Sequence, residues 1–282
     1  MRALLIDGGQ SGCRAAHLVD GVRVATATGP GLPRRGRDYG VLRALAGGDA
    51  DVVAAGLTGF TGDVAAVAAA VRAARVVVSN DAVTAHLGAL GGAPGVVVVA
   101  GTGAIALAVG ADGRWARADG CGTLLGDAGG GYWIGRAGLD AALRARDGRG
   151  GSADLLRRAE TRLGEAIVSR VYDAPDPVAV IAGFAREVAD AARGGDEMAR
   201  AIFGQAGREL ARTAAAARDR AGLDGPVSYA GGLFDAGELL LEPLRAVLGD
   251  VHPPLGDALD GAARLLERPP HFADLIHESG AP

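Results

Sequence analysis

The sequence predicts an α/β fold in two similar halves with a cleft between them. Its 282 residues are long for one hydrophobic core and comfortable for two domains. One hairpin pattern occurs twice, at residues 4–21 and 97–113: an apolar run, a tight turn of glycine and hydroxyl residues, a second apolar run and an Asp-Gly turn. Buried β runs then alternate with helical patterns, which favours a largely parallel sheet with an antiparallel edge.

The first half is expected to open with three antiparallel strands, because Asp20-Gly21 and the alternating runs around it are typical of a hairpin. The expected elements are strands at 2–7, 13–19 and 22–27, a surface loop at 29–37, a short helix at 41–46, a strand at 52–57, a helix at 63–74, a strand at 76–79 and a helix at 81–90.

The second half repeats this order and adds a long helical region. The expected elements are strands at 96–100, 105–109 and 114–117, a glycine-rich loop at 120–131, a helix at 133–146, helices over 152–222 with a proline break at 174–177, a strand at 227–230, a helix ending near 248 and a helix at 256–266. We expect the halves to divide near 110–114, with domains at 1–112 and 113–268, and residues 269–282 to form a loosely held tail.

Composition excludes several classes of protein. The net charge of −4, without a basic stripe, argues against nucleic-acid binding. No apolar stretch of about 20 residues is present, so no membrane span is expected. The first strand begins at residue 2 and leaves no room for a signal peptide, so a cytoplasmic location is expected. Cys13 and Cys121 match no metal-binding spacing and are too few for a disulfide framework.

The basic residues are all arginine. The absence of lysine excludes a Walker A loop, the lysine of protein kinases and Schiff-base chemistry. Any nucleotide site must therefore hold its phosphates by other groups.

The two glycine-rich turns are candidate phosphate sites. In the segment Asp7-Gly8-Gly9-Gln10-Ser11, backbone N–H groups and the Ser11 hydroxyl can donate to phosphate oxygens, while Asp7 can hold a hydrated Mg²⁺. Gly101-Thr102-Gly103 is its counterpart in the second half. Either turn alone could be a simple hairpin turn, but the repeat favours one phosphate chain held from both sides.

Asp81 is the candidate catalytic base. It follows a buried strand and begins a helix, and ligands of open α/β folds bind at the carboxyl ends of strands. Its alternative role is to cap that helix, but Asn80, the only asparagine of the chain, can cap instead and leave Asp81 to face the cleft.

Two further glycine-containing segments are candidate ligand sites. Gly126-Asp127 could bind substrate hydroxyls, or Asp127 could cap the following helix. Gly231-Gly232 follows a strand and could let an adenine or ribose lie against the backbone, although paired glycines also occur in ordinary strand–helix turns.

These motifs together resemble the actin-like ATPase superfamily and, more narrowly, the BadF/BadG/BcrA/BcrD ATPase family, which includes N-acetylglucosamine kinases. The resemblance covers residues 2 to about 266, and its motifs occur in family order. The most specific segment is Gly126-Asp127-Ala128-Gly129-Gly130-Gly131-Tyr132-Trp133-Ile134-Gly135, which is similar to the family's Gly-Asp-Glu-Gly-Ser-Gly-Tyr-Trp-Ile-Gly.

The resemblance implies two ribonuclease-H-like domains and an ATP-dependent sugar kinase that uses Mg²⁺. Asp81 would be the general base and Asp7 the metal ligand. The implied partner is an amino sugar or N-acetylhexosamine, and a homodimer is expected. The implied contacts with ATP are Gly8, Gly9, Gln10, Ser11, Gly101, Thr102, Gly103, Gly231 and Gly232, and those with the sugar are Thr58, Asp81, Gly126 and Asp127.

The chain departs from the family pattern around the sugar. Ile105 stands where sugar kinases carry a sugar-contacting asparagine, Ala128 replaces the signature glutamate, and Cys121 replaces a frequent tryptophan. Two alternatives therefore stay open. One is an ATP-driven activator with an iron–sulfur cluster, which needs cysteine ligands. The other is a nucleotide-binding sensor that has lost turnover.

Overall fold

The computed structural model describes residues 1–32 and 39–280. The expected surface loop at 29–37 is thus described only to residue 32, and its remainder lies outside the described residues. In chain order, the first elements are β1 (Arg2–Gly8), β2 (Cys13–Val19), β3 (Val22–Gly29), α1 (Gly40–Ala46), β4 (Ala50–Leu57), α2 (Val64–Ala70), β5 (Ala73–Asn80) and α3 (Asp81–Ala89).

The second part of the chain carries most of the helices. Its elements are β6 (Gly95–Ala100), β7 (Ala104–Val109), β8 (Trp115–Asp119), α4 (Gly131–Arg146), α5 (Ala153–Leu163), α6 (Ile167–Tyr172), α7 (Pro177–Gly183), α8 (Ala185–Arg193), α9 (Glu197–Ala221), β9 (Val227–Ala230), the 3₁₀ helix η1 (Gly232–Ala236), α10 (Glu238–Leu248) and β10 (Val251–His252). The chain ends with α11 (Ala258–Leu265), the 3₁₀ helix η2 (Pro270–Leu275) and β11 (His277–Gly280).

The two sheets share a topology of five strands, to which the first sheet adds the antiparallel β11. The first has the order β11-β5-β4-β1-β2-β3 and the second β10-β9-β6-β7-β8. In each, a meander of three antiparallel strands is extended by two parallel strands on the side of its first strand. The predicted α/β fold, built from a repeated unit, is confirmed.

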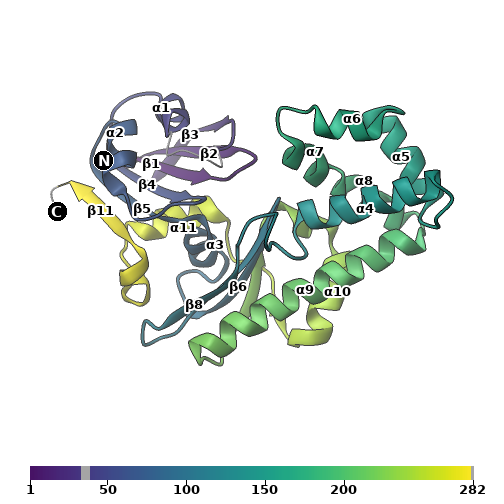
Figure 1. Ribbon diagram of the computed structural model, residues 1–282. Helices are drawn as coiled ribbons and strands as arrows, with labels where there is room; N and C mark the ends of the chain where they lie inside the picture. Colours follow the sequence, from purple (N-terminus) through teal and green to yellow (C-terminus); the bar gives the residue numbers. More distant parts are fainter. Residues whose placement is uncertain (33–38, 281–282) are drawn as a thin grey trace.

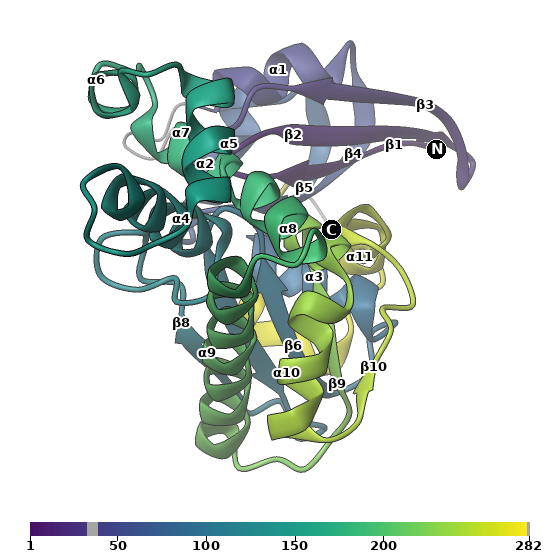
Figure 2. The same ribbon diagram turned by 90° about the vertical axis from the view of Figure 1, so that its right-hand side faces the viewer.

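Helices cover the sheets unequally (Figures 1 and 2). The first sheet carries the short α1 and α2, whereas α9 and α10 lie along one face of the second sheet, and α4 to α8 form a helical group beside it. Apolar residues of β6 and β7 pack against α4, α8, α9 and α10 in the largest core of the described residues. The predicted proline break is present, since α6 ends at Tyr172 and α7 begins at Pro177.

The boundary expected at 112/113 does not coincide with a change of sheet. It falls between β7 and β8, which are neighbouring antiparallel strands of the second sheet. The sheets instead divide between β5 and β6, and the chain returns to the first sheet with β11. The expected boundary misses the change of sheet because β7 and β8 are joined by a short turn, and strands joined by a tight turn pair with each other.

The tail was expected to be loosely held, and for residues 277–280 this is wrong. These residues pair antiparallel with β5, from His277 opposite Val78 to Gly280 opposite Arg75. The Glu278 carboxylate accepts a hydrogen bond of 2.6 Å from Arg75. The sequence His-Glu-Ser-Gly carries no apolar alternation, so only its contacts with β5 define it as a strand.

The helix expected at 63–74 ends earlier, at Ala70, and β5 begins at Ala73. Ala73 lies opposite Ala50 and Arg75 opposite Val52 in the parallel pairing with β4. Pairing with β4 therefore overrides the helical propensity of this alanine-rich segment.

Helix α3 lies between the two sheets and packs against α11 (Figure 1). Its residues from Ala82 to Ala89 are all buried. Glycines allow the two helix backbones to touch: a Cβ atom on Gly261 would lie 1.8 Å from the Thr84 carbonyl oxygen, and one on Gly88 1.9 Å from the Asp257 carbonyl oxygen. The position of α3, and of Asp81 at its start, thus depends on this contact.

We predict that Gly261→Ala destabilises the protein by about 1–3 kcal/mol, because the added methyl group forces the α3 and α11 backbones apart. Chemical denaturation measures the change. The matched control is Gly204→Ala in α9, where a Cβ atom meets nothing nearer than an arginine side-chain nitrogen at 3.5 Å. The control should be neutral or slightly stabilising; equal destabilisation by both substitutions would contradict the prediction.

Candidate active site

The two predicted phosphate loops meet. Ser11 lies in the turn between β1 and β2, and Thr102 lies in the corresponding turn between β6 and β7. Their hydroxyl oxygens are 2.6 Å apart, within hydrogen-bond distance. Residues 91 positions apart in the sequence are thus brought to one point between the two sheets.

A cavity of about 440 Å³ opens beside this contact, lined by both halves of the protein. Thr58 and Asp81 enter it from the carboxyl ends of β4 and β5, as parallel strands place them at one edge of the sheet. The other predicted site residues on its wall are Gly9, Gln10, Ser11, Gly101, Thr102, Gly103, Asp127 and Gly231. Gly8 and Gly126 are not among its lining residues; a Cβ atom on Gly8 would meet Leu57, and one on Gly126 would meet Asp119.

A second cavity of about 610 Å³ shares Ser11, Gly101 and Thr102 with the first. Residues of η1, which begins at Gly232, form one side of it, and α7 and α8 form the other with small residues such as Ala182, Gly183 and Ala189. The two cavities therefore flank the two loops.

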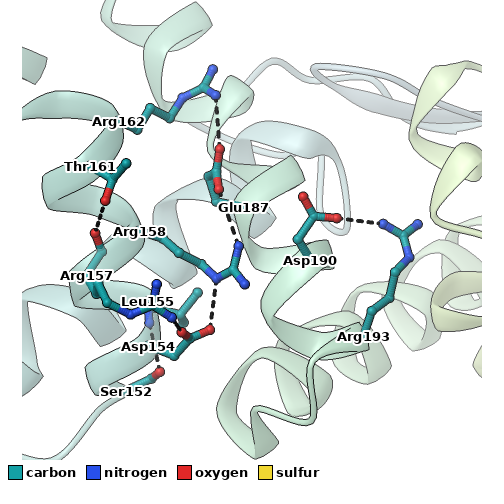
Figure 3. Close-up of polar contacts among 10 residues, drawn as sticks. All are labelled: Ser152, Asp154, Leu155, Arg157, Arg158, Thr161, Arg162, Glu187, Asp190 and Arg193. Carbon is teal, nitrogen blue, oxygen red and sulfur yellow. Dashed lines mark hydrogen bonds and ion pairs between the residues drawn. The ribbon is translucent and has the colours of Figure 1, made fainter.

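Ion pairs attach α5 to α8, whose residues line the second cavity (Figure 3). Glu187 on α8 lies 3.3 Å from Arg162 and 3.6 Å from Arg158 of α5, and Arg158 also pairs with Asp154 at 2.8 Å. Sequence analysis gave these helices no part in a ligand site, because nothing in their local pattern indicates which helix lies beside the phosphate loops.

Asp81 is partly buried at the wall of the first cavity. The backbone N–H of Ala82 donates to both the Asn80 side-chain oxygen, at 3.1 Å, and Asp81 Oδ1, at 2.9 Å. Asn80 thus caps α3 as predicted, and Asp81 accepts a hydrogen bond from the same backbone N–H group of Ala82. Burial is the main cause that raises the pKa of Asp81 to about 6; the nearby charge of Asp7 raises it further, while a hydrogen bond from Thr58 opposes the shift.

Asp127 packs directly against the second phosphate loop. A Cβ atom on Gly103 would lie 2.4 Å from Asp127 Oδ2, so only glycine fits there. Asp127 is itself buried, with a backbone φ of 59°. Its loop is held by Asp119, whose carboxylate accepts hydrogen bonds from the backbone N–H groups of Asp127 at 2.7 Å and Ala128 at 3.0 Å. Sequence analysis missed Asp119; its place before the glycine-rich loop was the available signal.

The start of α4 is bonded to the same loop. The N–H of Gly131 donates to the Gly101 carbonyl at 2.8 Å, and the N–H of Tyr132 donates to the Thr102 carbonyl at 2.9 Å. At the end of β9, Gly231 has a φ of +100°, and a Cβ atom there would lie 2.3 Å from the Ala100 carbonyl oxygen. These contacts fix the second loop from two sides.

The Asp7 carboxylate is already paired with a cation. Arg14 on β2 reaches Asp7 Oδ2 through two nitrogens, at 2.7 and 3.1 Å, and also contacts Asp257 at 3.0 Å. Both contacts with Asp7 fall on Oδ2. One carboxylate combined with substrate phosphates suits Mg²⁺, so Asp7 fits the expected ion through Oδ1 or through water. Within the described residues, no group of three or more His, Cys, Asp or Glu side chains could hold a metal.

The side-chain oxygen of Gln10, on the wall of the first cavity, is buried and has no hydrogen-bond partner among the described residues. Such an unpaired group costs about 1–3 kcal/mol. Rotation of the side-chain amide would let it bond to a ligand in the cavity.

Cys13 is 1% exposed within the first hairpin, whereas Cys121 is exposed beside the first cavity. Burial raises the pKa of the Cys13 thiol. His86 is also buried; its Nε2 donates to the Gly95 carbonyl at 3.0 Å, and burial lowers its pKa to about 4. Among the helices described, none is long and apolar enough to cross a membrane.

A family model and two relatives match the sequence. The model of the BadF/BadG/BcrA/BcrD ATPase family matches residues 40–253. An N-acetylmuramic acid/N-acetylglucosamine kinase of Clostridium acetobutylicum is 34% identical over 140 residues, which are 48% of this chain and 46% of the relative. An N-acetyl-D-glucosamine kinase of Dictyostelium discoideum is 31% identical over 189 residues, 62% of this chain and 58% of the relative. The chain spans about half the length of these relatives.

Solved structures share the fold. A candidate N-acetylglucosamine kinase from Chromobacterium violaceum is 29% identical, with a TM-score of 0.79 over 94% of this chain and 98% of that one. A ROK family glucokinase from Streptomyces griseus, solved with glucose and AMPPNP, is 17% identical, with a TM-score of 0.63 over 94% and 99% of the two chains. The latter likeness shows the fold alone.

We predict that Asp81→Asn stabilises the protein at neutral pH. The folded-state pKa of about 6 lies above the ordinary value of 3.8, so ionised Asp81 opposes folding as the pH rises through this range. The stability gain of the variant should be near zero below pH 4 and reach about 3 kcal/mol above pH 6. Denaturation at several pH values measures it.

The matched control for this prediction is Asp112→Asn. Hydrogen bonds from Arg114 lower the pKa of Asp112, so that its ionised form favours folding, and the substitution should slightly destabilise the protein at neutral pH. Parallel stability curves for Asp81→Asn and the wild type would contradict the prediction.

Proposed function

Because the chain belongs to the BadF/BadG/BcrA/BcrD ATPase family, we propose that it is an ATP-dependent kinase that phosphorylates a hydroxyl group of an amino sugar or N-acetylhexosamine. The observation that carries the proposal is the 2.6 Å contact between Ser11 and Thr102 at the cavity that also contains Asp81. The names of the two relatives support the substrate class.

In the proposed arrangement, the second cavity holds the adenosine of ATP and the two loops hold its phosphates. Gly232 lies on the wall of the second cavity, and Ser11 and Thr102 lie where the two cavities meet. Backbone N–H groups of the glycine-rich turns and the two hydroxyls would donate to phosphate oxygens. The γ-phosphate then points into the first cavity, towards Asp81.

Asp81 would accept the proton of the attacking hydroxyl. A carboxylate with a pKa of about 6 is ionised at neutral pH and is a stronger base than an exposed aspartate. Thr58 donates a hydrogen bond to it and restricts its orientation. Most of the rate would come from holding the hydroxyl in line with the phosphate.

Asp7 would hold Mg²⁺, which neutralises phosphate charge when bound. Arg14 fixes the Asp7 carboxylate through Oδ2 and is itself held by Asp257, the N-cap of α11. The proposal also includes a cytoplasmic location and a homodimer, which rest on the sequence alone.

The sugar pocket differs from the family pattern, because the apolar Ile105 lies on the wall of the first cavity. This favours an acceptor with an apolar face at that point. It also motivates the second candidate function, a nucleotide-binding sensor without turnover. The iron–sulfur alternative has less support, since the buried thiol of Cys13 cannot reach a shared cluster at the surface.

We predict that ADP release is stimulated by an amino sugar and that Asp81→Asn lowers kcat by about 10²–10⁴-fold with little change in KM. A coupled ADP assay over glucosamine, N-acetylglucosamine, N-acetylmuramate and glucose measures both, with Asp112→Asn as a control that should retain activity. Nucleotide binding by calorimetry without ADP release for any sugar would favour the sensor.

We also predict that kcat/KM falls tenfold per pH unit below about pH 6, because protonated Asp81 cannot accept the hydroxyl proton. A pH profile with subsaturating sugar and saturating ATP measures this limb. A profile that is flat between pH 5 and 7 in a folded enzyme would exclude Asp81 as the base.

A further inference from the structure

We infer that the acceptor sugar carries a carboxylate and that Arg117 binds it. This inference rests on the proposed function and names a narrower substrate class for the same site. Arg117 lies on β8 and lines the first cavity together with Asp81 and Ile105.

Strand geometry directs Arg117 toward the cleft. Side chains of a strand alternate between faces, and Ala116 and Ala118 pack into the core that contains α9. Arg117 and Asp119 therefore lie on the opposite face of the sheet. In the pairing with β7, Asp119 lies opposite Ile105 and Arg117 opposite Leu107, so Arg117 shares the face of the cavity-lining Ile105.

Position along the strand places Arg117 away from the phosphate loops. Leu107 is four residues beyond Gly103, which corresponds to about 13 Å along an extended strand. Gly103 borders the point where the loops meet, and Ile105 lies between it and the level of Arg117. The guanidinium group thus approaches the end of the cavity that an acceptor, not the γ-phosphate, would occupy.

Arg117 has no anionic partner in the described part of the chain. Its side chain forms no ion pair or hydrogen bond there, and Arg220 contacts only its backbone carbonyl, at 2.8 Å. The neighbouring Asp119 carboxylate accepts hydrogen bonds from backbone N–H groups instead. Of the two arginines that line the second cavity, Arg193 is paired with Asp190 at 3.0 Å, whereas Arg186 has no ion pair among the described residues. Arg117 is the arginine that lines the first cavity, where Asp81 lies.

The arrangement fits a carboxylate-bearing sugar. Arginine presents a planar set of donors that matches a carboxylate with two hydrogen bonds. Ile105 offers an apolar surface for the ring between this end and the reacting hydroxyl. A neutral sugar would leave the guanidinium group without an anion.

The experiment compares three acceptors with the wild type: N-acetylmuramate, its methyl ester and N-acetylglucosamine. The first two have nearly the same bulk and differ in charge, whereas N-acetylglucosamine lacks the lactyl group. We expect kcat/KM for the acid to exceed that for the ester by about 10- to 100-fold, as a charged hydrogen-bonded pair typically contributes.

Arg117→Met should remove this preference, so that kcat/KM for the acid falls to that for the ester, because the substitution removes the charge and keeps an unbranched apolar stem. The matched control is Arg114→Met on the same hairpin. Arg114 pairs with Asp112 at 2.5 Å and is not among the residues that line the first cavity, so its loss should leave the preference intact.

Calorimetric binding of the acid and the ester, to the wild type and to Arg117→Met, separates this inference from the proposed function. Arg117-dependent binding of the acid without ADP release from any sugar would overturn the proposed function and support the inference. Turnover of sugars with equal kcat/KM for acid and ester would overturn the inference and leave the proposed function standing. Failure of the acid to bind would also overturn the inference.

Discussion

The structure depends on the burial of α3 between the two sheets. This helix touches α11 backbone to backbone at Gly88 and Gly261, and neither position has room for a side chain. Its fixed position holds Asp81 at the carboxyl end of β5 and partly shields the carboxylate from water. The same burial raises the pKa of Asp81 to about 6. It therefore makes the carboxylate a stronger base and, at neutral pH, makes its ionised form a cost to the stability of the folded protein.

The second phosphate loop is held by its neighbours more than by its own sequence. Asp127 fills the space beside Gly103, Asp119 fixes the backbone around Asp127, and the start of α4 bonds to Gly101 and Thr102. These contacts leave the Thr102 hydroxyl facing Ser11 of the first sheet. If this loop binds phosphate as proposed, its donors are ordered before the ligand arrives, which lowers the free-energy cost of binding.

Some of the charged side chains around the two cavities are paired within the protein, and others are not. Arg14 is shared by Asp7 and Asp257, which links the first phosphate loop to the start of α11. Glu187 ties α8 to α5 behind the second cavity. Arg117, which lines the first cavity, has no ion pair among the described residues, and neither has Arg186 of the second cavity. The unpaired positive charge of Arg117 favours an acceptor that carries a negative charge.

The sequence by itself determined the repeated hairpins, the alternation of strands and helices and the cap at Asn80, because turns, periodicity and caps are local properties. It also identified Ser11, Thr102, Asp81 and Asp127 as members of motifs. Only the tertiary structure decided that these residues meet, that β11 completes the first sheet and that α7 and α8 form the wall of a cavity. It likewise decided the roles of Asp119 and Arg117, since contacts between distant segments depend on how the two sheets pack and leave no local pattern in the chain.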